Sequence, residues 1–322
     1  MYYNCDCVEG SKKYLKDNSI DLIITDPPYG IEGDKLDKHY NRDESKVIDG
    51  YVDIPLKEYA NFSNEWIKEA ERVLKPSGNM YIISGYTNLR HILNALANTK
   101  LQEINHIIWK YNFGVHTSKK YVSSHYHILY YAKPPTNKKT FNTNAFYGDN
   151  EKDERGSLNY RDREDVWVIN REYKPNEVKN KNQLPNKLLE KMLLYSSNQN
   201  DLVCDFFAGS FSTCKVALGL GRNACGFEIN KNAFVHQMRE IEKIKFGELL
   251  DGLKKPQQNK NVNAGKPLEQ VEIDLIMNEY QKFLIGGLTK KSAIERVGEI
   301  FGRGYWSIEK MLKKDGEIED GK

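Results

Sequence analysis

Groups that suit chemistry on the amine of a nucleobase occur in four consecutive residues, Asp26, Pro27, Pro28 and Tyr29. Such an exocyclic amine is a weak nucleophile because its lone pair is delocalised into the ring. The Asp26 carboxylate and the Pro27 carbonyl, on a backbone of fixed φ, could accept both amine hydrogens and localise that lone pair. Tyr29 offers an aromatic face for a base swung out of a duplex. The alternative is a rigid turn, but the apolar run directly before the motif favours the catalytic interpretation.

A second set of candidate residues follows another apolar run, residues 202–207, and continues into a small-residue turn. A strand that leads through such a turn into a helix lets a ligand approach backbone amides closely. Glu228, about 20 residues after Gly209, could accept both ribose hydroxyls of a nucleoside. The pattern GxGxxG is absent, which favours a nucleoside without a pyrophosphate; a purely structural turn is the alternative. The candidate cofactor-binding residues are Asp205, Phe207, Ala208, Gly209, Ser210 and Glu228.

The elements that would position these residues alternate between strands and helices. Apolar runs predict strands at 20–25, 80–84, 104–109, 202–207 and 223–228, and helical spacing predicts helices at 56–74, 88–97, 188–196, 213–220 and 233–250. Pro76, Ser77 and Gly78 are expected to separate the first of these helices from the strand that follows. The alternation predicts βαβ units and an α/β fold with a mostly parallel sheet.

Three further stretches suggest how the chain is organised. Residues 134–181 are polar and weakly periodic, so we expect a loop-rich insertion there rather than more sheet. Residues 251–267 contain almost no apolar side chain and predict a linker between a catalytic domain, 1–250, and a helical extension, 268–322. Helices expected at 268–284, 292–301 and 305–314 give helix-turn-helix spacing. The second helix of that pair would contact DNA; a hairpin that packs on the main domain is the alternative.

The composition excludes several classes of protein. The 322 residues are 39% hydrophobic and 29% charged, which is typical of a globular chain with a sizeable core. No apolar run is long enough to predict a membrane span, and the first residues show no secretory signal. Five cysteines without CxxC spacing argue against a disulfide framework or a zinc site. We therefore expect a cytoplasmic protein without a bound metal.

Charge is unevenly distributed, although 48 basic and 45 acidic residues give a net charge of only +3. No acidic residue lies between Glu103 and Asp149, and aromatic residues are interleaved with the lysines of this interval. Lysines neutralise phosphates and aromatic rings stack on bases, so the interval predicts a nucleic-acid surface; a solvated basic stretch is the alternative. The candidate DNA-binding residues are Lys110, Lys119, Lys120, Lys138 and Lys139.

The order of the two motifs resembles that of the β-class amino-methyltransferases of DNA, which use S-adenosylmethionine. In this family the catalytic motif precedes the cofactor motif, as Asp26–Tyr29 precedes Asp205–Ser210, and the resemblance covers roughly residues 1–245. It implies a doubly wound, seven-stranded sheet with a circularly permuted order, like a Rossmann fold. It also implies that Asp26 lies beside the cofactor, and that an aspartate at this position favours adenine as the target base.

Further cofactor-binding residues follow from the same resemblance. The opening segment resembles the family's N-terminal strand, whose aspartate lies near the cofactor adenine, and Gln183-Leu184-Pro185-Asn186-Lys187-Leu188 resembles its QxPxxL segment. The residues implied are Asp6, Cys7, Gln183, Asn186 and Lys187. Two departures are visible. Phe211 replaces a glycine of the cofactor loop and is expected to crowd it. His125-Tyr126-His127 lacks the family's glutamate, so we assign this segment no catalytic role.

The leading hypothesis is a site-specific DNA adenine methyltransferase that transfers the methyl group in one displacement step. The sequence contains no Pro-Cys nucleophile loop, which argues against methylation at a cytosine carbon. Alternatives are methylation of the cytosine N4 amine, a non-enzymatic DNA-binding protein on the same scaffold, and methylation of RNA or of a protein glutamine. Duplex DNA is the expected partner, and a homodimer and a cognate restriction endonuclease stay open.

Overall fold

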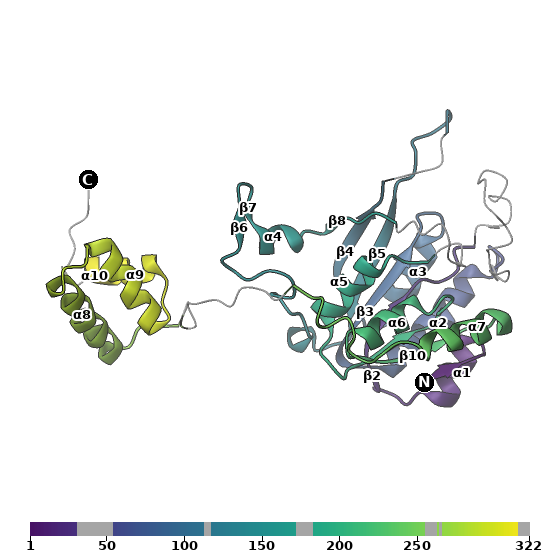
Figure 1. Cartoon of the computed structure of the whole chain (residues 1–322). Helices are drawn as coiled ribbons and strands as arrows, with labels where there is room; N and C mark the ends of the chain where they lie inside the picture. The colour runs from purple at the N-terminus through teal and green to yellow at the C-terminus, as the bar shows by residue number, and fades with distance from the viewer. Residues whose placement is uncertain (31–53, 113–116, 172–182, 255–262, 264–265, 315–322) are drawn as a thin grey trace. The chain divides into compact units, whose positions relative to one another are not determined.

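The computed structural model describes residues 1–30, 54–112, 117–171, 183–254, 263 and 266–314 (Figure 1). The chain divides into two compact units, residues 1–145 with 160–254 and residues 146–159 with 255–322. None of the helices in the described part of the chain is long and apolar enough to cross a membrane.

The first unit is built on one mixed sheet with the strand order β1-β10-β9-β2-β3-β5-β4-β8. Neighbouring strands are parallel except for β5, which is antiparallel to β3 and β4. The strands are β1 (Tyr2–Tyr3), β2 (Ile20–Thr25), β3 (Leu74–Ser84), β4 (Gln102–Lys110), β5 (His125–Ala132), β8 (Val166–Val168), β9 (Leu202–Asp205) and β10 (Asn223–Phe227). The predicted α/β fold with a doubly wound, mostly parallel sheet is confirmed.

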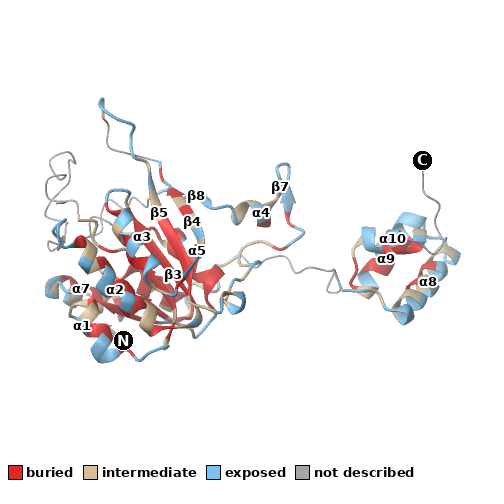
Figure 2. Ribbon diagram, turned by 180° about the vertical axis from the view of Figure 1, so that it is seen from behind, coloured by how far each residue is buried: buried red, intermediate tan, exposed pale blue. Residues whose placement is uncertain are grey.

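Helices cover both faces of this sheet, and in Figure 2 the central strand β3 is buried along most of its length. Successive side chains of β3 point to opposite faces of the sheet, and each face packs against a different group of helices. Ile82 and Trp66 belong to the hydrophobic core on the side of α1, α2 and α3, whereas the neighbouring Tyr81 hydrogen-bonds to Ser196 of α5 (2.7 Å). The helices of the unit are α1 (Cys7–Tyr14), α2 (Tyr59–Val73), α3 (Leu89–Ala97), α4 (Leu158–Asp162, which the unit boundary divides), α5 (Asn186–Ser196), α6 (Ser212–Gly219) and α7 (Lys231–Ile241).

Several expectations about elements are wrong. The sheet has eight strands rather than seven, because β8, inside the expected loop-rich insertion, pairs with β4. The insertion also contains a short hairpin, β6 (Lys152–Asp153) with β7 (Gly156–Ser157), and a 3₁₀ turn, η3 (Thr136–Lys138). Residues 76–78 are part of β3 rather than a break before it.

The helix expected at 233–250 ends at Ile241. The amides of Gly247 and Leu249 instead donate to the carbonyls of Leu218 and Gly219 at the end of α6 (2.9 and 2.8 Å). Tertiary hydrogen bonds thus replace the last helical turns that the apolar spacing predicted.

The second unit contains three helices with a hydrophobic core of their own: α8 (Gln270–Ile285), α9 (Lys290–Phe301) and α10 (Tyr305–Lys314). The three helices expected in this part of the chain are confirmed to within two residues at each end. Their core residues are Ile276, Tyr280, Ala293, Ile294, Val297, Ile308, Met311 and Leu312.

Phe211 does not crowd the turn after β9, contrary to expectation. Its backbone is left-handed, with φ at 55°, and it caps the start of α6. Its side chain is fully buried and packs edge-on against Tyr2 (5.5 Å between ring centroids) and Phe234 (5.9 Å). Its ring therefore stabilises the core beneath the turn, at the cost of a backbone conformation that glycine adopts more readily.

We predict that Phe211→Gly destabilises the protein although it relieves the backbone. Removing a buried phenylalanine side chain costs about 3–5 kcal/mol, more than the roughly 1–2 kcal/mol that the left-handed conformation costs. Urea unfolding should show a net loss of about 2–3 kcal/mol. Asn200→Gly is the matched control, because Asn200 has the same sign of φ (69°) and an exposed side chain. A gain in stability for both variants would contradict this account.

Candidate active site

The two predicted motifs lie at one edge of the sheet. Asp26 follows β2, Asp205 ends β9 and Glu228 follows β10, and these parallel strands are neighbours in the sheet. From β9 the chain continues to β10 on one side, and from β2 it continues to β3 on the other, so the strand order reverses between β9 and β2. Open α/β sheets bind ligands at the carboxyl ends of the strands at such a switch point.

Two buried side chains fix the loop after β2. The Tyr59 hydroxyl donates to the Pro28 carbonyl (2.8 Å), and the Asn88 amide donates to the Tyr29 carbonyl (2.6 Å) and the Gly30 carbonyl (3.1 Å). Asn88 precedes α3 but makes no side-chain cap with it. Gly30 has φ of 63°, and a Cβ there would lie 2.7 Å from the Tyr59 ring. The loop is therefore held from the α2 and α3 side.

The hydrogen bonds that anchor this loop do not involve two of its acceptor atoms, Oδ2 of Asp26 and the Pro27 carbonyl oxygen, which can therefore bind a ligand. The Tyr29 hydroxyl donates to Oδ1 of Asp26 (2.7 Å). Among the described residues, none donates to Oδ2 of Asp26 or to the Pro27 carbonyl. The motif thus keeps one carboxylate oxygen and one carbonyl oxygen for the two hydrogens of an amine, as the sequence predicted.

An aromatic cluster that we did not predict lies beside Tyr29. The ring of Tyr126 is 5.7 Å from that of Tyr29, and Tyr111 and Trp109 lie 5.3 and 5.4 Å from Tyr126. The segment 125–127, to which we assigned no catalytic role, therefore contributes Tyr126 to the site. Tyr126 reaches the site because antiparallel pairing sets the start of β5 beside the carboxyl end of β3.

Arg171 is the second unpredicted residue. Its guanidinium donates to the Tyr126 hydroxyl (2.9 Å) and stacks over the rings of Tyr111 and Tyr126 (5.3 and 5.4 Å). It follows β8, whose exit is tied to β4 by the Ile169 amide, which donates to the Lys110 carbonyl (3.1 Å). No sequence motif marks Arg171; only the pairing of β8 with β4 brings it to this edge.

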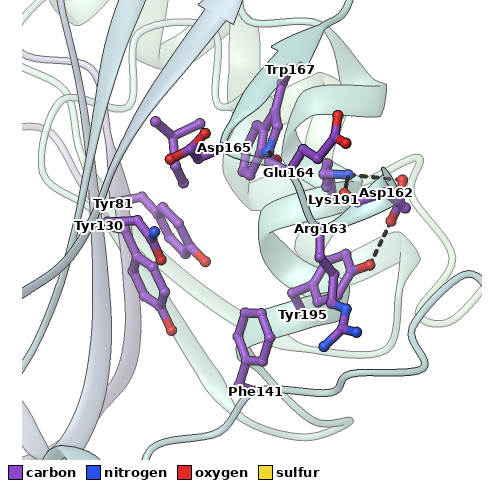
Figure 3. A pocket seen from close by; sticks show the side chains of 12 residues that line it. Tyr81, Tyr130, Phe141, Asp162, Arg163, Glu164, Asp165, Trp167, Lys191 and Tyr195 are labelled. Atoms are coloured by element: carbon purple, nitrogen blue, oxygen red, sulfur yellow. Dashed lines mark hydrogen bonds and ion pairs between the residues drawn. The ribbon is translucent and has the colours of Figure 1, made fainter. Parts of the chain in front are cut away.

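The segment that leads to β8 is clamped to α5 beside a small hollow (Figure 3). Asp162 accepts from the Lys191 ammonium (2.8 Å) and from the Tyr195 hydroxyl (2.5 Å), while Tyr81 and Tyr130 form the sheet side of the hollow. Because Lys191 and Asp162 satisfy one another, we interpret this hollow as the joint between the insertion and the sheet.

The cofactor motif is braced by its own carboxylates. Asp205 accepts from the Thr25 hydroxyl (2.9 Å) and the Phe207 amide (3.1 Å) through Oδ1. Glu228 accepts from the Gly209 amide through Oε2 (2.9 Å) and from the Asn230 amide through Oε1 (2.7 Å). The Ala208 amide donates to the Phe227 carbonyl (2.9 Å) and Ser210 bonds to the Ser212 hydroxyl (2.6 Å), so each predicted residue has a defined place in the turn.

Withdrawal from water disfavours charge on all three carboxylates of this edge. Burial raises the pKa of Asp26 to about 7 and that of Asp205 to about 6, and it also raises the pKa of Glu228. The charge of Asp205 adds to the rise at Asp26 and Glu228, whereas the Tyr29 hydrogen bond and Arg171 lower the pKa of Asp26. A positively charged ligand would stabilise all three ionised forms.

The remaining predicted cofactor residues are placed as follows. Asp6 caps α1, accepting from the amides of Val8 and Glu9 (2.8 and 3.1 Å), and the Cys7 side chain is buried in the core. The Ser196 carbonyl, at the end of α5, accepts from Asn79 in the middle of β3, and the next residue, Ser197, accepts from Arg222, which directly precedes β10. The start of α5 with Gln183, Asn186 and Lys187 therefore lies toward the carboxyl edge.

The lysines predicted to bind DNA do not form one surface. Lys110 ends β4, and Lys119 and Lys120 precede β5, with the Lys120 ammonium donating to the Tyr86 hydroxyl (3.0 Å) beyond the carboxyl end of β3. Lys138 and Lys139 follow β5, whose last residue pairs with Asn79. Because β5 is antiparallel, these two lysines lie at the opposite edge of the sheet.

Comparison with known proteins agrees with this geometry. Residues 20–239 match the model of the N6/N4 methyltransferase family, described as DNA methylase. The chain is 35% identical over 227 residues to the type II methyltransferase M.HpaI of Haemophilus parainfluenzae, covering 68% of this chain and 67% of that protein. It is 32% identical over 283 residues to the DNA adenine methyltransferase YhdJ of Escherichia coli K12, covering 82% and 90%.

Among solved structures, the complex of M1.HpyAVI with SAM has 24% identity and a TM-score of 0.52, covering 74% of this chain and 98% of that one. The cytosine-N4-specific PvuII DNA methyltransferase has 16% identity and a TM-score of 0.54, covering 76% and 90%. Fold and site together define a Rossmann-like methyltransferase. The chain belongs to the DNA methylase family, which confirms the predicted class of S-adenosylmethionine-dependent DNA amino-methyltransferases.

The carboxyl edge fits such a cofactor. S-adenosylmethionine carries a sulfonium and an ammonium charge, and the three carboxylates provide the opposite charge. Gly226 is packed so closely that a Cβ would lie 3.2 Å from the Asp205 carbonyl and from Ala208, so the backbone beneath the turn is held tightly. The donor set of this edge therefore suits a cationic nucleoside.

We predict a pH dependence that identifies the role of Arg171. Because the ionised Asp26 accepts hydrogen bonds from the substrate, the rate of methyl transfer rises with pH, with a midpoint below the value of about 7 of the free protein since the cationic cofactor lowers the pKa of Asp26. Arg171→Met removes a charge that lowers the pKa of Asp26, so the midpoint moves to higher pH and the rate at pH 6 falls by roughly threefold or more. Arg171→Lys keeps the charge and should keep the midpoint nearer to that of the wild type. An unchanged midpoint in single-turnover rates of Arg171→Met contradicts the assignment.

Proposed function

We propose that the protein methylates the exocyclic N6 amine of adenine in duplex DNA. The observation that carries this proposal is the pair of acceptors at the end of β2, Oδ2 of Asp26 and the Pro27 carbonyl. The Asp26 carboxylate, in particular, suits adenine by the resemblance of the motif to adenine enzymes. The relative YhdJ, named as a DNA adenine methyltransferase, supports the same base.

The site residues act on the base in a definite order. A base flipped from the duplex stacks on Tyr29, and its two amine hydrogens bond to Asp26 and Pro27. Bound S-adenosylmethionine supplies an electrophilic methyl group on its sulfonium. The positive charge that develops on the amine nitrogen is stabilised by Asp26, whose Oδ2 takes the surplus proton and releases it to water. Arg171 keeps Asp26 ionised before the transfer.

Cofactor contacts are assigned by the same reasoning. Glu228 holds the ribose hydroxyls, and the turn Phe207–Ser210 with Asp205 borders the nucleoside. Asp6 with Cys7, and Gln183, Asn186 and Lys187 at the start of α5, complete the cofactor side of the edge. Methylation of the cytosine N4 amine is the second candidate, since both amines suit the motif and the PvuII enzyme has the same fold.

The product nucleoside tests the target base. We predict that unmethylated duplex DNA, incubated with the protein and S-adenosylmethionine and digested to nucleosides, yields N6-methyl-2′-deoxyadenosine, identified by mass spectrometry. Asp26→Ala should lower the rate by about 10²-fold or more while the affinity for DNA stays close to that of the wild type. If the product is instead N4-methyl-2′-deoxycytidine, the target base is cytosine and not adenine. If Asp26→Ala retains its activity, Asp26 is not the catalytic residue.

The division of the basic interval gives a second test. We predict that Lys119→Glu with Lys120→Glu weakens DNA binding by roughly tenfold or more and lowers its salt dependence, because these lysines lie at the carboxyl edge. Lys138→Glu with Lys139→Glu is the control of equal charge at the opposite edge and should bind nearly as the wild type does. DNA affinity is measured by fluorescence anisotropy. If the two double variants lose affinity equally, DNA does not bind preferentially at the carboxyl edge.

Partners beyond DNA stay predictions. Relatives named as type II methyltransferases support a cognate restriction endonuclease as a partner. A homodimer also stays a prediction.

A further inference from the structure

The last helix of the chain has an exposed face that the catalytic function does not use. In α10, Ile308, Met311 and Leu312 are buried in the core of the second unit. On the other side, Trp306 is 77% exposed and Lys310 and Lys314 are exposed as well. Residues at positions i, i+4 and i+8 share one face of a helix, so these three side chains form a single strip. We call it the α10 strip.

The charge of the unit is polarised between its helices. Helix α10 contains three lysines and one glutamate, whereas α8 contains three carboxylates and one lysine. The large exposed side chains of α8 are aliphatic and not aromatic, with Val271 71% exposed and Ile285 86% exposed. Within the described part of this unit, the α10 strip therefore combines excess positive charge with an exposed aromatic ring.

The connection between α9 and α10 fixes the angle at which α10 is presented. A Cβ on Gly298 of α9 would lie 2.7 Å from the Arg303 carbonyl, so the turn packs directly on the helix. Gly302 ends α9 in the left-handed conformation with φ of 59°. The buried Arg303 guanidinium pairs with Glu272 of α8 (2.7 Å) and donates to the Pro267 carbonyl (3.1 Å). The turn is thereby locked to all three helices.

We propose that the α10 strip binds the major groove of duplex DNA as a contact separate from the catalytic edge. An α-helix fits the major groove, and in helix-turn-helix units the first turn of the second helix faces the bases. Trp306 lies in that first turn and offers an apolar surface for thymine methyl groups. Lys310 and Lys314 neutralise phosphates along the groove. The inference rests on DNA as the substrate, and it adds a second contact to the same molecule.

The consequence is a dependence on DNA length. A short duplex that spans only the methylation site engages the catalytic edge, whereas a duplex about 30 base pairs longer, roughly three helical turns, offers a place for α10 as well. Because the two contacts belong to one chain, engaging both raises the affinity without changing the chemical step.

The test uses the full chain with Lys310→Glu and Trp306→Ala. Each variant should bind the long duplex roughly tenfold more weakly than the wild type does, and Lys310→Glu should lower the slope of log affinity against log salt by about one unit. Binding of the short duplex and the maximal rate on it should stay unchanged, which also shows that the variants fold. Lys282→Glu, the same charge reversal on exposed α8, is the matched control and should retain the advantage of the long duplex.

Three results would overturn the proposal: no gain in affinity with length for the wild type, equal losses for Lys310→Glu and Lys282→Glu, or a change in oligomeric state in place of a change in DNA affinity. The last result would assign the α10 strip to a second copy of the chain. Failure of the proposed catalytic function is separate, since it would appear as no methylation of either duplex by the wild type.

Discussion

The site depends on one electrostatic constraint: three carboxylates, withdrawn from water to different extents, end neighbouring strands at the switch point between β9 and β2. Burial raises the pKa values of Asp26, Asp205 and Glu228, and the charge of Asp205 adds to the rise at Asp26 and Glu228, while backbone amides and hydroxyls hold the carboxylates in place. Such an edge favours a cationic ligand and an amine that becomes cationic during the reaction. The strand order therefore places the three carboxylates together in the free protein, before any cationic ligand binds.

The insertion after β5 contributes a residue, Arg171, to the site at this edge of the sheet. Lys191 of α5 holds Asp162, the chain continues into β8 beside β4, and the exit of β8 delivers Arg171 to the rings of Tyr111 and Tyr126. The ion pair between Lys191 and Asp162 thus helps to position the Arg171 guanidinium at the site. A segment outside the central strands thus contributes a charged group to a reaction centre built by the sheet.

Much of the fold and part of the site could be predicted from the sequence, because that information is local. Asp26 follows one apolar run, Asp205 lies within a second and Glu228 ends a third, so strand ends could be assigned approximately from the sequence. Tyr126 and Arg171 were missed because their positions depend on strand pairings between distant segments. The same reason divides the basic interval: β5 reverses direction, so lysines that are close in sequence lie at opposite edges. Phe211 was expected to crowd the turn because the sequence does not show that its ring is buried.

The titration of Asp26 tests the central claim most directly. Carboxyl ¹³C NMR of aspartate-labelled protein, with Asp26→Asn to assign the signal, measures its pKa with and without S-adenosylmethionine. The account predicts a pKa of about 7 for the free protein and a lower value when the cationic cofactor is bound. An Asp26 that titrates near the ordinary aspartate value of about 4, and does not respond to the cofactor, would contradict it.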